Sequence, residues 1–410
     1  MFVADFHIHS KYSRATSRNM NIPGLIQWAH YKGIQLLGTG DFTHHLWLQE
    51  LKQDLEVRED KGLLYSQGIH FILSGEVSNI FSQHGKGYRV HNIIMVPSFA
   101  LAYEVNKCLS HYGNLASDGR PILGMSCEAL AGELARISED IMLVPAHIWT
   151  PWFSVFGSNS GFNSLEDAFG GHLDFITALE TGLSSDPAMN WRLSHLDKFS
   201  LISNSDSHSP QRIGREANVF ECALDYWEIK RALKTKDKNK FLYTIEFFPE
   251  EGKYHYDGHR NCHIRFHPSQ TKEHKNICPV CKRPLTRGVL YRVDELADRE
   301  EGVAPPGAIG FKSLIPLDEI IAEAKGVSRT SKAVEKEYIG LVREFDSEFN
   351  LLVNVDEKDF SSHLDYKIAE GIKRVRARQV DILPGFDGEY GTIKIFDKEK
   401  DSEKPQMTLF

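Results

Sequence analysis

Short apolar runs alternate with longer amphipathic segments from residue 1 to about residue 230. The short runs have the composition of buried strands, and the longer segments repeat apolar residues at helical spacing. This alternation predicts strand and helix units around a parallel sheet, and seven such units predict a barrel. The expected strands are residues 2–8, 34–39, 71–77, 90–96, 141–146, 175–179 and 199–204. The expected helices include residues 22–31, 46–57, 101–111, 127–138 and 189–198.

The composition changes after this region. A lysine-rich stretch at 230–240 leads into a segment rich in Gly, His and Cys, and helical patterns follow at 317–324 and 333–344. A chain of 410 residues exceeds what one hydrophobic core usually supports. We therefore expect a barrel over residues 1–230, a small module over 231–300, a mainly helical region over 301–397 and a flexible tail over 398–410.

Candidate metal ligands recur where the predicted strands end. In the run from Asp5 to His9, the polar residues alternate with Phe6 and Ile8, so Asp5, His7 and His9 share one side of a strand. Later strands end in further carboxylates and imidazoles, at Asp41, Glu76, His91, His147, Asp206 and His208. The carboxyl ends of barrel strands meet at one rim, so the pattern predicts a metal cluster there. Mixed nitrogen and oxygen ligands suit zinc, manganese or iron.

A second metal signal lies in the small module. His259-Arg-Asn-Cys262 and Cys278-Pro-Val-Cys281 form two ligand pairs, and this spacing predicts one structural zinc. The three cysteines are firm candidates, whereas His255, His267 and His274 compete with His259 for the fourth position. The other cysteines are scattered through apolar segments, which favours buried thiols in a reducing compartment.

Charge and hydropathy narrow the class of protein. The net charge is −8, with 41% hydrophobic and 25% charged residues, which is typical of a globular protein without an overall basic excess. The sequence shows neither a membrane-spanning apolar stretch nor a signal peptide, so we expect a cytoplasmic protein without a membrane partner. Nothing in the pattern requires more than a monomer.

The barrel motifs resemble those of the polymerase and histidinol phosphatase (PHP) family, whose members are distorted seven-unit barrels that hold up to three metals. The resemblance implies an α/β fold: a distorted (β/α)7 PHP barrel, then a small zinc-binding domain and a helical C-terminal region. It also implies one metal among His7, His9, Glu76 and Asp206, and a second among Glu76, His91 and His147. A third would use His208 with His44 or His45, because this chain reads Thr39-Gly-Asp-Phe-Thr-His-His where the family usually has Thr-Asp-His. Asp41 is expected as a ligand or as the neighbour of one.

Two or three divalent metals (Zn, Mn, Fe or Mg) would support metal-assisted displacement at phosphorus. Asp206, His9, Glu76 and His147 are the expected catalytic residues.

Segments 252–262, 278–281, 293–298 and 384–391 extend the resemblance to the endonuclease Q family over nearly the whole chain. That resemblance implies a DNA repair endonuclease. Its substrate would be damaged double- or single-stranded DNA, cut 5′ of a deaminated base (uracil, hypoxanthine or xanthine) or of an abasic site.

Aromatic and basic residues are candidates for contact with DNA. They are Trp149, Trp152, Arg283, Arg374 and Arg376. Packing of a long loop and a solvated helix face are the competing interpretations of the tryptophans and the arginines.

The tail ends Gln406-Met-Thr-Leu-Phe410, which resembles the short peptides that dock on DNA sliding clamps through residues such as Gln406, Leu409 and Phe410. Three other functions remain open from the sequence. They are a small-molecule phosphatase of the histidinol-phosphate kind, a PHP exonuclease, and a DNA-binding module without catalytic activity.

Overall fold

The predicted ligand run follows the first strand of a mixed, eleven-stranded sheet. The structure is a computed structural model, and it describes residues 1–361 and 363–396. The strands of this sheet are β1 (Phe2–Asp5), β2 (Leu36–Gly38), β3 (Glu56–Arg58), β4 (Leu63–Ser66), β5 (Ile69–Gln83), β6 (Lys86–Val96), β7 (Ile122–Leu123), β8 (Met142–Pro145), β11 (Ala217–Phe220), β12 (Phe241–Glu246) and β15 (Gly310–Ser313). β1, β2 and β5 are parallel, whereas β11 runs antiparallel to β1.

Side chains from six strands share one apolar cluster, so the sheet curves around a common core. The cluster includes Ala4, Leu36, Ile72, Ile93, Val144 and Ile202. The last of these lies on β10 (Leu201–Ile202), which pairs in parallel with β9 (Leu179–Glu180). Close approach of β2 to the start of the ligand run requires a glycine, because a Cβ on Gly38 would lie 2.1 Å from the carbonyl oxygen of Phe6.

The α/β class is confirmed, but the sheet is not the purely parallel barrel that the pattern predicted. β5 and β6 form one long antiparallel hairpin, and β8 is antiparallel to β6. Glu76 and His91 therefore lie within strands rather than at their ends. The residues between β5 and β6 are a short turn with no room for a crossover helix, and parallel pairing needs such a connection.

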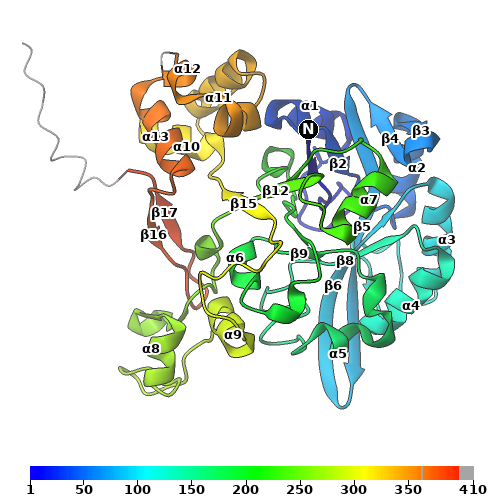
Figure 1. The fold of residues 1–410 in the computed structure, drawn as a ribbon, viewed down its shortest axis with the longest axis horizontal. Coiled ribbons are helices and arrows are strands. Elements are labelled where there is room, and N and C mark those ends of the chain that lie inside the picture. Colours follow the sequence, from blue (N-terminus) through cyan, green and yellow to red (C-terminus); the bar gives the residue numbers. More distant parts are fainter. Residues whose placement is uncertain (362, 397–410) are drawn as a thin grey trace, which may run out of the picture.

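Helices cover the sheet much as expected, with two differences (Figure 1). Residues 56–58 form β3 rather than the end of a helix, and the helix expected at 189–198 is replaced by α6 and the short η3. Of the strand expected at 175–179, Phe175 instead ends η2 and only Leu179 lies in a strand, β9. The helices of this part are α1 (Ile22–Lys32), α2 (His45–Asp54), α3 (Phe99–Leu109), α4 (Cys127–Ile137), α5 (Leu165–Phe169), α6 (Pro187–Asn190) and α7 (Tyr226–Thr235), with short η1 (Glu59–Lys61), η2 (Gly170–Phe175), η3 (Ser194–Leu196) and η4 (Pro210–Arg212).

The small module and the helical region lie beside the sheet domain (Figure 1). The sheet itself continues past the predicted boundary at residue 230, since β12 and β15 pair within it. The module contains η5 (Pro249–Glu251), β13 (Asp257–His259), η6 (Arg260–Cys262), β14 (Ile264–Phe266), α8 (Pro268–Glu273) and α9 (Val289–Leu296). The later region contains α10 (Leu317–Lys325), α11 (Lys332–Glu344), η7 (Asn350–Asn354), α12 (Glu357–Ser361), α13 (Tyr366–Arg376) and the hairpin of β16 (Asp381–Leu383) and β17 (Thr392–Lys394).

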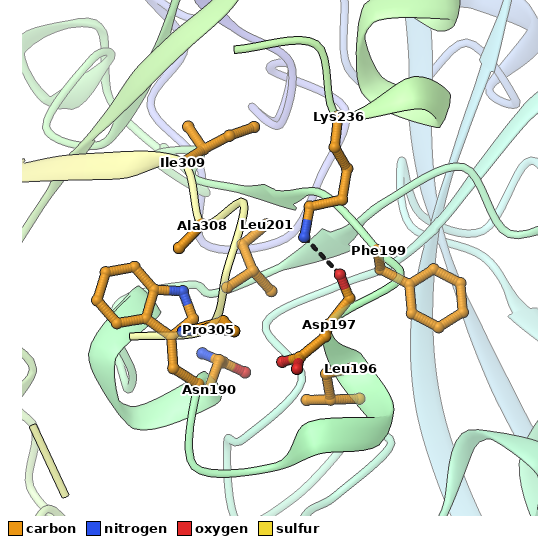
Figure 2. A pocket seen from close by; sticks show the side chains of 10 residues that line it. Asn190, Leu196, Asp197, Phe199, Leu201, Lys236, Pro305, Ala308 and Ile309 are labelled. Carbon is orange, nitrogen blue, oxygen red and sulfur yellow. Dashed lines mark hydrogen bonds between the residues drawn. The ribbon is translucent and has the colours of Figure 1, made fainter. Parts of the chain in front are cut away.

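The segment that returns from the module packs closely on the sheet domain. Pro305, Ala308 and Ile309 lie against the loop after α6 around a cavity of only about 20 Å³ (Figure 2). Nζ of Lys236 donates to the carbonyl oxygen of Asp197 at 2.5 Å in the same place. Such a volume holds about one water molecule, so this contact is structural. Within the described residues, no helix has the length and apolar content needed to cross a membrane.

Glu246 on β12 makes the stability of the fold depend on pH. Its side chain is fully buried, with Thr181 and Thr244 as hydrogen-bond partners, and burial raises its pKa from 4.5 to about 8. The folded state therefore keeps a proton that the unfolded state releases between pH 4.5 and about 8. This contribution to the free energy of unfolding is complete below pH 4.5 and is lost as the pH rises through about 8.

We expect Glu246→Gln to remove this pH dependence while keeping the shape of the side chain. The difference in the free energy of unfolding between variant and parent should grow by up to about 1.4 kcal/mol per pH unit across the window. Urea unfolding from pH 5 to pH 8.5 measures it, with the exposed Glu104→Gln as the control. Parallel pH profiles of parent and Glu246→Gln would contradict the assignment.

Candidate metal centre

Four side chains converge at the end of β1. Nε2 of His9 lies 3.1 Å from Asp206 Oδ1 and 3.3 Å from Glu76 Oε2, and Nε2 of His7 lies 3.5 Å from the same Glu76 oxygen. One ligand atom from each of His7, His9, Glu76 and Asp206 falls within 4.8 Å of all the others. Nε2 of His7 is buried and has no hydrogen-bond partner. Four converging donors with an unpaired nitrogen among them suit a divalent cation.

The other oxygen of Glu76 belongs to a second group. Oε1 lies 2.6 Å from Nδ1 of His91 and 3.0 Å from Nε2 of His147, and these two nitrogens are 3.3 Å apart. Glu76, His91 and His147 again place one ligand atom each within 4.8 Å of one another. Glu76 thus turns one oxygen toward each group, which is the arrangement of a bridging carboxylate.

The ring nitrogens that face away from the two groups have partners of their own. Nδ1 of His7 meets Glu180 at 3.0 Å, Nδ1 of His9 meets Asp41 at 3.0 Å, and Nδ1 of His147 meets the hydroxyl of Thr150 at 3.1 Å. Contacts of this kind fix the orientation and tautomer of a ligating imidazole.

Asp41 lies outside both groups of converging ligands. Its carboxylate contacts His9 and accepts hydrogen bonds from Ser10 and Ser13, at 2.6 to 2.9 Å from the two serines. With its oxygens engaged in this way, Asp41 orients His9. Asp41, His147 and Asp206 all have a positive φ (49°, 30° and 46°), so the backbone is strained at three residues of the site.

The residues proposed for a third metal are not brought together in the part of the chain that the structure describes. The ring of His208 lies 4.4 Å from that of His9, and its Nδ1 is 3.9 Å from Asp206. His44 instead lies between Tyr12 and His45, with ring centroids 4.4 and 5.2 Å away. A third metal position stays a prediction.

The charges of the centre depend on one another. Burial alone would raise the pKa of Glu76, but His91, His7 and Arg120 hold that pKa well below its usual range. Burial likewise opposes protonation of His7, yet the carboxylates of Glu180, Glu76 and Asp206 raise its pKa well above the usual value. The cluster therefore demands positive charge between its carboxylates, which protons or metal cations supply.

Sequence reasoning missed two residues of the centre. Glu180 contacts His7 and also accepts from the backbone N–H of His147 at 2.7 Å. It follows an apolar residue at the end of β9, so the pattern used for the other carboxylates would have found it. Arg120 donates to Glu76 at 3.0 Å, and it lies in a loop with no distinguishing signal.

In the small module, His259, Cys262, Cys278 and Cys281 place their ligand atoms within 4.8 Å of one another. The competing histidines have other surroundings. His255 stacks on Tyr256, His267 accepts from a backbone N–H at the start of α8, and His274 stacks on Phe266. The geometry therefore favours His259 as the fourth member of this candidate metal site. A set of one imidazole and three thiol groups is typical of closed structural zinc sites.

Three of the residues expected to contact DNA, Trp149, Arg374 and Arg376, have partners inside the fold, which favours packing as their role. Their contact with DNA stays a prediction. Trp149 is 1% exposed and donates to Asn190 at 2.8 Å. Arg376 donates to three backbone carbonyls around η7, and Arg374 donates to Glu370 and to a backbone carbonyl. These guanidinium groups satisfy carbonyl groups at irregular turns, which a basic sequence pattern cannot reveal.

Trp152 and Arg283 remain exposed. Trp152 is 50% exposed beside a groove of about 630 Å³ that also contacts Tyr254 and Arg287. Gln406, Leu409 and Phe410, the candidates for clamp binding, lie outside the described residues.

The fold and the site define an α/β protein with two groups of candidate metal ligands that share Glu76 and with a separate cluster of one histidine and three cysteines in the small module. The whole chain is similar to two solved structures. The lesion-specific endonuclease PfuEndoQ from Pyrococcus furiosus shares 32% identity at a TM-score of 0.86, with 99% of this chain and 100% of that chain covered. An endonuclease Q in complex with a 27-mer duplex carrying an abasic lesion shares 31% identity at a TM-score of 0.82, with 97% of each chain covered.

Two further proteins are similar in sequence. The protein YqxK of Bacillus subtilis is 28% identical over 409 residues, 95% of this chain and 98% of that protein. MJ0043 of Methanocaldococcus jannaschii is 33% identical over 272 residues, 64% of this chain, and the match spans only 33% of MJ0043. The family model described as the MJ0043 C-terminal domain matches residues 316–379. With 32% identity over the full length of the Pyrococcus furiosus structure, the chain belongs to the endonuclease Q family.

We expect Glu76→Gln to remove metal from both groups of ligands, because the two groups share this carboxylate. His91→Ala should remove metal from the second group only. Metal content after dialysis measures both effects, with the zinc of the small module counted separately. Glu50→Gln, whose carboxylate contacts Lys11 and Tyr12, is the control. If Glu76→Gln kept the metal content of the parent, Glu76 would not be a bridging ligand.

The zinc module allows a similar test of its fourth ligand. His259→Ala should lose the structural zinc, since only three of the four converging donors remain. His267→Ala and His274→Ala should retain it. Zinc content and release of zinc to a chromogenic chelator provide the measurement. If His259→Ala retained zinc and His267→Ala or His274→Ala lost it, the histidine whose substitution removed the zinc would be the fourth ligand.

Proposed function

We propose that this chain is a metal-dependent endonuclease that cuts damaged DNA on the 5′ side of a deaminated base or an abasic site. One observation carries the proposal. The two ligand groups joined by Glu76 occur in a chain that is similar, over nearly its full length, to a lesion-specific endonuclease and to an endonuclease Q bound to an abasic duplex. A small-molecule phosphatase or an exonuclease would not account for the similarity across the module and the helical region.

The residues present fit two divalent cations. Four imidazole groups and a carboxylate are buried at 7% exposure or less, and an unpaired Nε2 on His7 points to a missing partner among them. His7, His9, Glu76 and Asp206 would hold one ion, and Glu76, His91 and His147 the other. When bound, such ions draw charge from phosphate oxygens and lower the pKa of a water molecule.

The exposed side of the centre is where DNA would enter. The side chain of Asp206 is 27% exposed and that of His208 is 34% exposed, whereas the remaining side chains of the two ligand groups are 9% exposed or less. His7 and His9 hold the pKa of Asp206 below its usual value, so its carboxylate is ionised and is able to orient a water molecule or accept its proton. Arg120, with 35% of its side chain exposed beside Glu76, is placed to hold a phosphate oxygen.

The groove beside Trp152 supports contact with a DNA strand close to the centre. The ring of Phe153, the next residue, packs against that of His91 with 4.8 Å between the ring centroids, and the Phe153 carbonyl oxygen accepts from the His91 backbone N–H. Trp152 and Tyr254 offer exposed rings for base stacking, and Arg287 adds a positive charge. Arg283 is an exposed candidate on the same module. We retain the C-terminal residues Gln406, Leu409 and Phe410 as a proposed contact with a sliding clamp.

The position of the cut tests this function. End-labelled duplexes that carry uracil, hypoxanthine, an abasic site or no lesion are incubated with the protein and manganese or magnesium. We expect one incision 5′ of the lesion, which chelation of the metals abolishes. Asp206→Ala should slow it by roughly 10²- to 10⁴-fold through loss of the group that orients the water. Asp60→Ala, which changes an exposed carboxylate, is the control.

Degradation of undamaged DNA from its ends would instead identify an exonuclease. Hydrolysis of small phosphomonoesters without any cut in DNA would identify a phosphatase. Either outcome would leave the metal centre in place and overturn the proposed function.

A further inference from the structure

The loop of residues 147–163 supports both histidines of the second ligand group. It begins at His147, and its Thr150 hydroxyl contacts Nδ1 of that histidine at 3.1 Å. Farther along, the carbonyl oxygen of Phe153 accepts from the backbone N–H of His91 at 3.1 Å, and the Phe153 ring packs against the His91 ring at a tilt of 37°. The conformation of this loop therefore determines where the two imidazoles lie relative to Glu76.

One arginine from the zinc module holds the far part of this loop. Arg292 on α9 donates from Nε to the carbonyl oxygen of Phe156 at 3.2 Å and from Nη2 to that of Phe162 at 3.0 Å. Nη2 also donates to the side chain of Asn163 at 2.7 Å. The Arg292 side chain is only 13% exposed. It joins the two ends of the turn at 156–162, and the Phe156 N–H in turn bonds to the carbonyl oxygen of Ile148, the residue after His147.

The start of α9 is held by the strand that carries the zinc ligand His259. The backbone N–H groups of Gly288 and Leu290 donate to Asp257 and to the His255 carbonyl oxygen at 2.6 and 3.1 Å. Thr286 and Gly258 exchange two backbone hydrogen bonds of 2.9 Å. A zinc ion held by His259, Cys262, Cys278 and Cys281 would fix the two segments that this pairing joins. A zinc ion at this site would therefore also restrict the position of Arg292 on α9.

We propose that the zinc module positions the second ligand group of the barrel through Arg292, so that occupancy of the zinc site increases the affinity of Glu76, His91 and His147 for their metal. Arg292 is a positioning residue, because it acts through the loop and contacts neither ligand. The inference rests on the metal centre of the proposed function, but its readout is metal binding and does not involve DNA.

Loss of Arg292 should not detach the module from the sheet domain. Three other contacts join them independently. Arg192 donates to Asp294 at 2.7 Å, Ser194 N–H donates to Asp298 at 2.8 Å, and Arg299 contacts Asp197 at 2.5 Å. A change in metal affinity on substitution of Arg292 would therefore reflect the conformation of the loop 147–163 and not separation of the module from the sheet domain.

The test is titration of Co²⁺ into the zinc-loaded, full-length protein in a His9→Ala background, which disables the first ligand group. Arg292→Gln should weaken binding at the second group about tenfold, near the low end of what distant supports of metal ligands usually contribute. Arg292→Lys keeps the positive charge but has no planar group with several N–H donors, and it should weaken Co²⁺ binding less than Arg292→Gln does. Lys275→Gln removes an exposed positive charge of the same module and should leave the affinity unchanged. Equal affinities in the Arg292→Gln and Lys275→Gln variants would overturn the proposal.

A double-mutant cycle separates positioning from a general loss of structure. Removing zinc through Cys278→Ser should weaken Co²⁺ binding in the chain with Arg292 but produce little further loss in Arg292→Gln. Additive losses would overturn the proposal. Zinc content and a cooperative melting transition establish folding, and if Arg292→Gln fails either criterion, the cycle is run with Arg292→Lys. Loss of incision with metal affinities as expected would count against the proposed function only.

Discussion

The Glu76 carboxylate is the constraint on which the rest of the structure depends. It is 1% exposed and has imidazole nitrogens near both oxygens and the guanidinium of Arg120 at 3.0 Å. A buried carboxylate is costly unless charges and hydrogen bonds surround it, so the fold must bring its partners from the segment after β1, from β6 and from the loop after β8 to one point. The sheet achieves this because β5, which carries Glu76, belongs both to the parallel strands β1, β2 and β5 and to the antiparallel hairpin of β5 and β6.

Much of this centre was predictable from sequence. The alternation in Asp5 to His9 indicates which residues share a side, and carboxylates or imidazoles beside apolar strands indicate buried polar clusters. His7, His9, Glu76, His91, His147 and Asp206 were found in this way, and the structure brings them together. The spacing of the two ligand pairs likewise pointed to Cys262, Cys278 and Cys281, which the structure brings together in the small module.

What the sequence did not reveal depends on contacts between distant segments. Strand direction was one such feature, since an apolar run has the same pattern whether its neighbour is parallel or antiparallel. The roles of Trp149 and Arg376 were another. A tryptophan in a loop is equally suited to packing in a core or to stacking on a base, and only the structure shows that Trp149 is buried. Likewise, only the structure shows that Arg376 donates to the carbonyl groups of η7. The choice of His259 among four histidines also required the backbone path of β13.

The carboxylates of the centre and the net negative charge of the chain both oppose the approach of a DNA phosphate. The net charge is −8, and arginines such as Arg292 and Arg376 are used inside the fold. At the centre, Asp206 is a partly exposed carboxylate, and the buried carboxylates of Glu76 and Glu180 lie near it around His7. Two carboxylates repel a phosphate at short range in a poorly solvated site. Cations at this centre would reverse that repulsion, so the ions that activate water would also make the site attractive to DNA. In the proposed mechanism, metal binding therefore precedes productive binding of the substrate.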